Sequence, residues 1–136
     1  MIIKEFISET NKNQMITILL KHYKVESVKV KLKSMKDHAN YDVDRGTLEL
    51  STKYKTIKPS QIKQFLITII HEIRHAMDAK KYGWKRFKGM YEYEMNYQIS
   101  QNKDEYKDNK YEIEAEEFGQ KNYMKWYRIF KKDNLF

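Results

Sequence analysis

Two histidines and a glutamate in the stretch FLITIIHEIRHAMD are the residues of this chain whose types and spacing could do chemistry. His71 and His75 are four residues apart, and Glu72 lies between them. On a helix, side chains four residues apart lie one turn from each other, so both imidazoles could bind one metal ion. Glu72 could then act as general base toward a metal-activated water. This HExxH pattern is typical of zinc sites, although a chain with four histidines can also contain it by chance.

The motif lies in a stretch that predicts a helix of about 20 residues. Pro59 is followed by Ser60, a natural N-cap, and the helical pattern runs to Lys80 or Lys81. At about 100° per residue, one side of this helix is apolar and collects Ile62, Phe65, Leu66, Ile69, Ile70, Ile73 and Met77. The two histidines fall on the opposite side, beside Gln64 and Thr68. Two imidazoles away from the apolar side favour metal chelation over a role in the core; the alternative is two surface histidines.

A catalytic zinc ion needs a third protein ligand besides the two histidines, and keeps one position open for water. The chain contains no cysteine. His22 and His38 precede the motif, and no histidine follows it. The third ligand is therefore expected to be a carboxylate, which is an accepted zinc ligand.

Residues 110–132 predict a last long helix that offers this carboxylate. Glu112 falls inside its apolar arc and Glu116 lies one turn later at the margin, whereas Glu114 and Glu117 point to solvent. The arc is formed by Tyr111, Ala115, Phe118, Gly119, Tyr123, Trp126, Ile129 and Phe130. An unpaired carboxylate facing a core is costly, and metal coordination removes that cost. The alternative for Glu112 is a first-turn glutamate favoured by the helix dipole.

The combination of HExxH with a downstream glutamate helix resembles the gluzincin metallopeptidases. The stretch YEIEAEEFG, residues 111–119, is similar to the glutamate helix of small ImmA/IrrE-type members, and the likeness covers roughly residues 25–120. It implies a minimal zincin-like fold. It also implies that His71, His75 and Glu112 bind Zn²⁺ and that Glu72 is the catalytic base.

In that resemblance, Glu116 takes the place of an aspartate or asparagine that does not bind the zinc ion but hydrogen-bonds to a zinc-bound histidine and orients it. This chain departs from the pattern here, because a glutamate side chain is longer than either. The metzincin extension is absent, because Asp78 and Lys81 stand where glycine and histidine are required. SprT-like proteases usually take a histidine as third ligand, which this chain lacks. In such domains an edge strand before the HExxH helix aligns the peptide, and GTLELS, residues 46–51, is expected to be that strand.

A tyrosine could stabilise the oxyanion in such a reaction, and the sequence does not choose one. The candidates downstream of the motif are Tyr91, Tyr93, Tyr97, Tyr106 and Tyr111. Related enzymes use a histidine, tyrosine or arginine from this region. Most of the five are expected to be packing residues.

The remaining elements predict a single α+β domain over residues 1–136. An N-terminal helix is expected over residues 10–24, capped by Thr10 or Asn11. Residues 25–33 alternate between apolar side chains and lysines and predict a strand, and two short strands flank the turn at Asp44–Gly46. Within residues 83–109 a helix is expected only around Tyr91–Ser100, and the rest is expected to be loop.

The net charge of +8 comes mostly from lysines spread along the whole chain, as on a solvated exterior. This distribution of charge predicts at most weak, non-specific binding to nucleic acid. The partner that the metallopeptidase hypothesis predicts is a peptide or protein substrate. No apolar run is long enough for a membrane span, and MIIKEFISETNK does not read as a secretory signal. We therefore expect a phage or bacterial protein in the cytoplasm, or in the host cytoplasm or virion if viral. The alternative function is a basic interaction or nucleic-acid-associated module, of viral or other origin, with a structural or vestigial metal.

Overall fold

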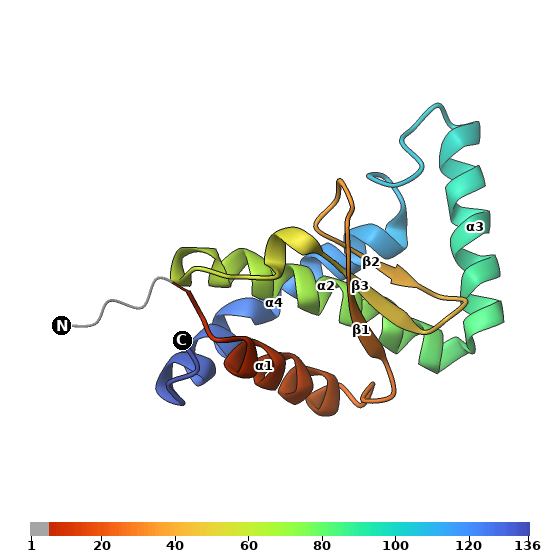
Figure 1. Cartoon of the computed structure of the whole chain (residues 1–136). Helices are drawn as coiled ribbons and strands as arrows, with labels where there is room; N and C mark the ends of the chain where they lie inside the picture. Colours follow the sequence, from red (N-terminus) through yellow and green to blue (C-terminus); the bar gives the residue numbers. More distant parts are fainter. Residues whose placement is uncertain (1–5) are drawn as a thin grey trace.

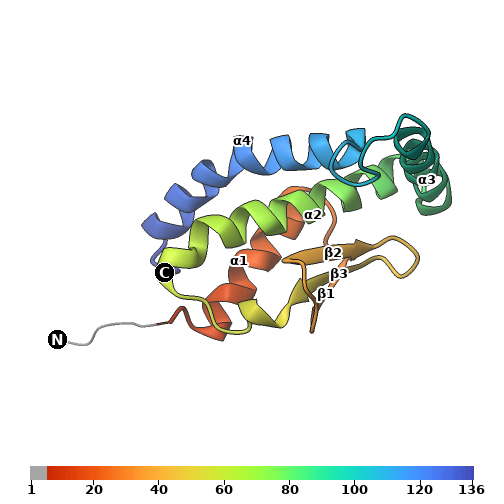
Figure 2. The same cartoon turned by 90° about the horizontal axis from the view of Figure 1, so that it is seen from above.

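A computed structural model describes residues 6–136 of the chain (Figures 1 and 2). The first five residues, which the predicted domain and the stretch inspected for a signal both include, lie outside the described residues. The fold is mixed α+β, as predicted. In chain order its elements are α1 (Glu9–His22), β1 (Lys29–Lys33), β2 (Ala39–Asp42), β3 (Thr47–Ser51), η1 (Thr52–Tyr54), η2 (Pro59–Gln61), α2 (Ile62–Tyr82), α3 (Trp84–Ser100) and α4 (Lys110–Lys132).

The three strands form one sheet in the order β1-β3-β2, in which β3 is parallel to β1 and antiparallel to β2. The hairpin between β2 and β3 turns at Asp44–Gly46, as predicted: Asp42 accepts two backbone N–H groups there, and Gly46 has a φ of +60°. The expectation that residues 46–51 form an edge strand is wrong. Leu48 and Leu50 are fully buried because β3 lies at the centre of the sheet, and β2 is the edge strand beside α2.

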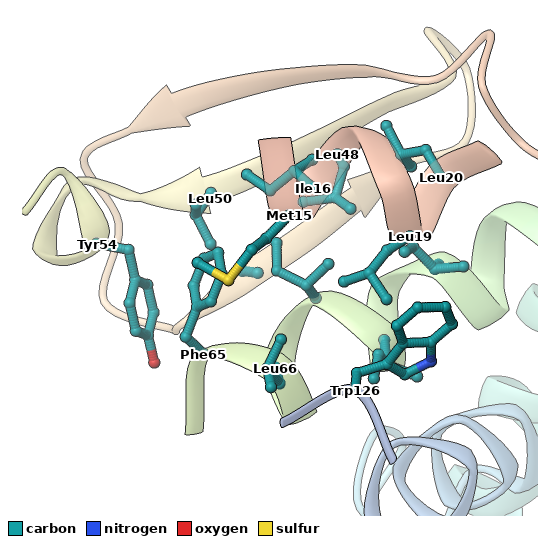
Figure 3. Close-up of a cluster of buried hydrophobic side chains, with 14 of the residues drawn as sticks. Met15, Ile16, Leu19, Leu20, Leu48, Leu50, Tyr54, Phe65, Leu66 and Trp126 are labelled. Atoms are coloured by element: carbon teal, nitrogen blue, oxygen red, sulfur yellow. The ribbon is translucent and has the colours of Figure 1, made fainter. Parts of the chain in front are cut away.

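Helix α2 lies between two layers of the molecule. In Figure 2, α4 runs along one side of α2, and α1 and the sheet lie on the other. The apolar side of α2 packs with Phe65 and Leu66 against Met15 of α1 and Leu50 of β3, which together form the core drawn in Figure 3. Within residues 6–136, no helix combines the length and the apolar character that crossing a membrane requires.

The close approach of α4 to α2 depends on Gly119. A Cβ atom built there would lie 2.9 Å from the backbone oxygen of Ile67 and 3.4 Å from its side chain. Ordinary contacts between these atoms are wider than 3.0 Å, so any larger residue would push the two helices apart. Gly119 lies two turns after Glu112 on the same helix, and it therefore helps to set how near that carboxylate comes to α2.

Helix ends differ from the predictions where capping chemistry was misread. Ser8, not Thr10 or Asn11, caps α1 through its hydroxyl oxygen. Ser60 lies inside the 3-10 turn η2 and is not the N-cap of α2.

The largest error concerns α3, which spans Trp84–Ser100 and is nearly twice as long as expected. Gly83, with a φ of +84°, separates it from α2, so the chain turns there without any loop. The predicted bounds of the last helix, 110–132, are confirmed, and Asn109 caps it by accepting the N–H of Tyr111.

Candidate metal centre

Helices α2 and α4 bring His71, His75 and Glu112 together. The Nε2 atom of His71 lies 2.9 Å from Glu112 Oε1, and the Nε2 atom of His75 lies 2.8 Å from the same oxygen. One nitrogen or oxygen from each of the three residues falls within 4.8 Å of the other two, so the group could hold a metal ion. Three side chains from two helices thus converge on one point.

The histidines lie opposite the apolar side of α2, as their positions in the sequence predict, yet this side is not open to water. His75 is 5% exposed and His71 is partly buried, because α4 covers the helix here. Glu112 is 7% exposed. The helical periodicity of α2 correctly places the histidines away from the core. It does not predict that α4 covers them, because that contact depends on a distant part of the chain.

Both ring nitrogens of His71 have a carboxylate partner, since its Nδ1 lies 2.9 Å from Glu116 Oε2. Burial opposes a charge on this ring, but hydrogen bonding to Glu112 and the charge of Glu72 raise the pKa of His71 to about 9. Burial alone would raise the pKa of Glu112, and hydrogen bonds from the two histidines lower it to about 2. Without a metal, His71 is therefore a cation at neutral pH and Glu112 an anion.

The local charge balance leaves room for a bound cation. Three carboxylates, Glu72, Glu112 and Glu116, surround the two histidines, and within residues 6–136 no lysine or arginine hydrogen-bonds to them. The nearby Arg74 contacts Asp78 and Glu114 instead. A divalent ion would replace the Nε2 proton of His71 and leave Nδ1–H to donate to Glu116, as in many metal sites.

The spacing of the donors also suits a small divalent ion. Two ligands that are each about 2.0 Å from a tetrahedral zinc ion lie about 3.3 Å apart. The nitrogen-to-oxygen distances of 2.8 and 2.9 Å require an opening of about half an ångström to reach this value. Two imidazole nitrogens and a carboxylate oxygen suit several divalent transition metals.

Glu72 lies beside the convergence point without taking part in it. Its Oε1 is 3.8 Å from His71 Nε2, and the residue is 4% exposed. Burial raises the pKa of Glu72, and the two neighbouring histidines oppose that change. The carboxylate therefore holds a proton more readily than an ordinary glutamate would.

Two hollows meet at Glu72 and Tyr106, which line both of them. The aromatic hollow, of about 280 Å³, lies beside His75 and is lined further by Tyr41, Val43, Phe87, Tyr91 and Met95. The acidic hollow, of about 240 Å³, lies beside His71 and is lined further by Asp37, Gln64, Thr68 and Glu116. The edge strand β2 contributes residues to both hollows, and one of the two histidines lines each, so we call the adjoining hollows together the cleft.

The structure separates the five candidate tyrosines. Tyr91 donates its hydroxyl hydrogen to Glu112 Oε2, and Tyr111 is buried against Phe87. Tyr93 and Tyr97 are 77% and 50% exposed and line neither hollow, whereas Tyr106 is 54% exposed and lines both. The contact of Tyr91 with Glu112 was missed from the sequence. Residues 91 and 112 belong to different helices, and no local signal links them.

No protein-family model, no curated protein and no solved structure matches this chain. The likeness to gluzincins therefore rests on the residues of the HExxH motif and of the glutamate helix. What these residues can do follows from their own arrangement and chemistry.

Proposed function

We propose that this chain is a zinc-dependent metallopeptidase that hydrolyses peptide bonds. In this proposal His71, His75 and Glu112 hold the zinc ion and Glu72 is the general base. The observation that carries it is the convergence of both histidine Nε2 atoms on one oxygen of Glu112, beside the buried carboxylate of Glu72, which lies 3.8 Å from His71 Nε2 and hydrogen-bonds to neither histidine. A zincin-like identity of the α+β fold belongs to the same proposal.

A bound zinc ion supplies Lewis acidity, which lowers the pKa of a water molecule and polarises a carbonyl group. Glu72 accepts a proton from the attacking water and delivers it to the leaving nitrogen as the carbon–nitrogen bond breaks. The products are a carboxylic acid and an amine, so water is the one co-reactant. The raised pKa of Glu72 suits a group that must both accept and donate this proton.

Two neighbouring side chains orient the proposed ligands. Glu116 accepts the Nδ1–H of His71, which leaves the Nε2 lone pair of that ring free for the metal. Tyr91 donates to Glu112 Oε2, so that Oε1 is the oxygen turned toward the histidines. Both contacts restrict rotation of the side chain that they hold.

The edge strand β2 offers a place for the substrate backbone. Its outer edge is unpaired within the described part of the chain, and Ala39, Asn40 and Tyr41 line the cleft. An extended peptide can add to such an edge as a further strand, with main-chain hydrogen bonds providing affinity. A peptide added at this edge would border the cleft that Glu72 lines.

Metal analysis combined with peptide cleavage tests the function. The purified protein should bind about one zinc ion per chain and cleave a mixture of unstructured peptides. Glu72→Gln should keep zinc affinity and folding but lose about 10²–10⁴-fold in rate, the usual contribution of a general base. Glu117→Gln, an exposed position on α4, is the matched control. Absence of zinc after reconstitution, or unchanged cleavage by Glu72→Gln, would contradict the proposal.

The second candidate function is a basic interaction or nucleic-acid-associated module, in which the metal is structural or vestigial. The excess of 27 basic over 19 acidic residues favours it. In that case the chain would bind zinc without cleaving any peptide, and Glu72→Gln would change nothing that can be measured. The experiment above therefore also separates the two functions.

A further inference from the structure

The loop between α3 and α4 carries a tyrosine that has no role in the site described so far. Tyr106 lines both hollows, and Glu72 is the other residue that does so. The two side chains therefore border the cleft at the point where the hollows meet. His71 lines one hollow and His75 the other, so Tyr106 borders the same cleft as both proposed metal-binding histidines.

The backbone around Tyr106 is held by hydrogen bonds to two aspartates. Asp104 Oδ1 accepts the backbone N–H of Tyr106 at 2.9 Å and that of Lys107 at 2.6 Å. Asp108 Oδ2 accepts the N–H of Asp104 at 2.9 Å. These hydrogen bonds restrain the short turn without any substrate, which favours a group that must meet a transition state.

The hydroxyl of Tyr106 is suited to donate a hydrogen bond. Tyr106 is 54% exposed, and the part of the ring turned into the cleft is desolvated. This partial burial and the negative charges of Glu112 and Glu72 raise the pKa of Tyr106, so the phenol keeps its proton at neutral pH. Within residues 6–136 its hydroxyl has no hydrogen-bond partner, whereas the hydroxyl of Tyr91 is already engaged by Glu112. The proton of Tyr106 is available to a ligand in the cleft.

We propose that Tyr106 is a catalytic residue that donates a hydrogen bond to the oxyanion formed as water adds to the peptide carbonyl. This inference rests on the proposed peptidase function. No proton is transferred: the hydroxyl stabilises negative charge on the carbonyl oxygen and releases it when the carbon–nitrogen bond breaks. Because the charge develops only in the transition state, the contact contributes to turnover and not to substrate affinity.

Cleavage kinetics of the zinc-loaded protein give the first test. Tyr106→Phe should lower kcat by about 10²–10³-fold, the usual cost of removing one oxyanion donor, and leave KM and zinc affinity unchanged. Tyr93, which is 77% exposed against 54% for Tyr106, lines neither hollow, and Tyr93→Phe should cleave like the wild type. If Tyr106→Phe instead raised KM and left kcat unchanged, the assignment of Tyr106 would be overturned.

Binding measurements provide a readout that does not depend on turnover. A phosphinic peptide imitates the tetrahedral transition state, and Tyr106→Phe should weaken its binding by about 10²-fold. An ordinary peptide should bind Glu72→Gln and the Glu72→Gln/Tyr106→Phe double variant equally well. If Tyr106→Phe cleaves peptides and binds the phosphinate like the wild type, this inference fails and the peptidase function stands. If the wild type neither cleaves peptides nor binds the phosphinate, both fail.

Discussion

Helix α2 buries two sides by different means. Toward α1 and the sheet it buries Phe65 and Leu66, neither of which is exposed (Figure 3). On the side covered by α4 it buries Glu72 and His75, which are 4% and 5% exposed. Apolar burial stabilises the fold by about 25 cal/mol per Å² without further conditions. Burial of a carboxylate or an imidazole costs free energy unless a partner compensates it.

This difference separates the side that stabilises the fold by apolar burial from the side that carries the proposed metal ligands. The hydrogen bonds among His71, His75 and Glu112 compensate the second side in part. His75 Nδ1 nevertheless lacks a partner within the described residues. A helix selected for stability alone would carry apolar residues on both buried sides. Substitutions on the two sides should therefore have separable effects.

Removal of the carboxylate from α4 should have the largest effect on the polar side. Glu112→Ala takes away the oxygen on which both histidines converge, and we expect zinc binding to be lost. Competition with a chromogenic chelator measures this affinity. Glu117→Ala, on the exposed side of the same helix, should bind zinc like the wild type. If Glu112→Ala bound zinc with wild-type affinity, the contrast between the apolar and polar sides of α2 would fail. The polar side would then not be a metal site.

A cavity on the apolar side should cost stability and leave metal binding intact. Phe65→Ala is expected to lower the free energy of unfolding by about 3–5 kcal/mol, the usual cost of truncating a buried phenylalanine. Urea unfolding of the metal-free protein measures the loss. Provided that the variant folds, zinc should add the same increment of stability as in the wild type. A smaller increment would show that the two sides are coupled.

Glu116 should have an intermediate effect that tests the register of α4. Losing the partner of a metal-bound histidine typically weakens metal binding or activity by about 10–100-fold, and Glu116→Ala is expected in this range. Glu114→Ala should change zinc affinity hardly at all, because Glu114 faces Arg74 at 3.8 Å and not the histidines. If Glu114→Ala were the more damaging, the ligand on α4 would have been misassigned.

The smallest effect expected is on nucleic acid. The lysines are scattered, so binding to duplex DNA should be non-specific, with a Kd of about 10⁻⁴–10⁻⁶ M at physiological salt, and should weaken steeply as salt rises. Glu112→Ala should not alter it, because the polar side of α2 would not be involved. Fluorescence anisotropy with labelled duplex DNA at two salt concentrations measures this Kd and its dependence on salt. A tight and sequence-selective complex would favour the interaction module instead.

The sequence predicts the apolar side of α2 well and the surroundings of the polar side poorly. A period of 3.6 residues identifies Phe65 and Ile73 as core positions, because packing against a flat layer imposes that period. The same period puts Glu112 in the apolar arc of α4, where its burial is observed. These inferences succeed because each needs only one helix.

Errors arise where two elements determine the outcome. The central place of β3 depends on the parallel pairing with β1, which joins strands that are not neighbours in sequence. Tyr91 meets Glu112 only because α3 continues unbroken from Trp84, after a turn that one positive φ at Gly83 permits. Tyr106 could not be chosen among the tyrosines, because its place follows from where α4 begins.

The proposed ion would also tie together two distant parts of the chain. His75 and Glu112 are 37 positions apart, and α3 with the turn of Tyr106 lies between them. A metal held by both would act as a reversible cross-link and would remove open conformations of that segment. Amide exchange and proteolysis in residues 101–109 should therefore slow when zinc is bound, while α1, which lies outside the closed segment, should be less affected. The supply of metal would then set how readily this part of the chain is digested.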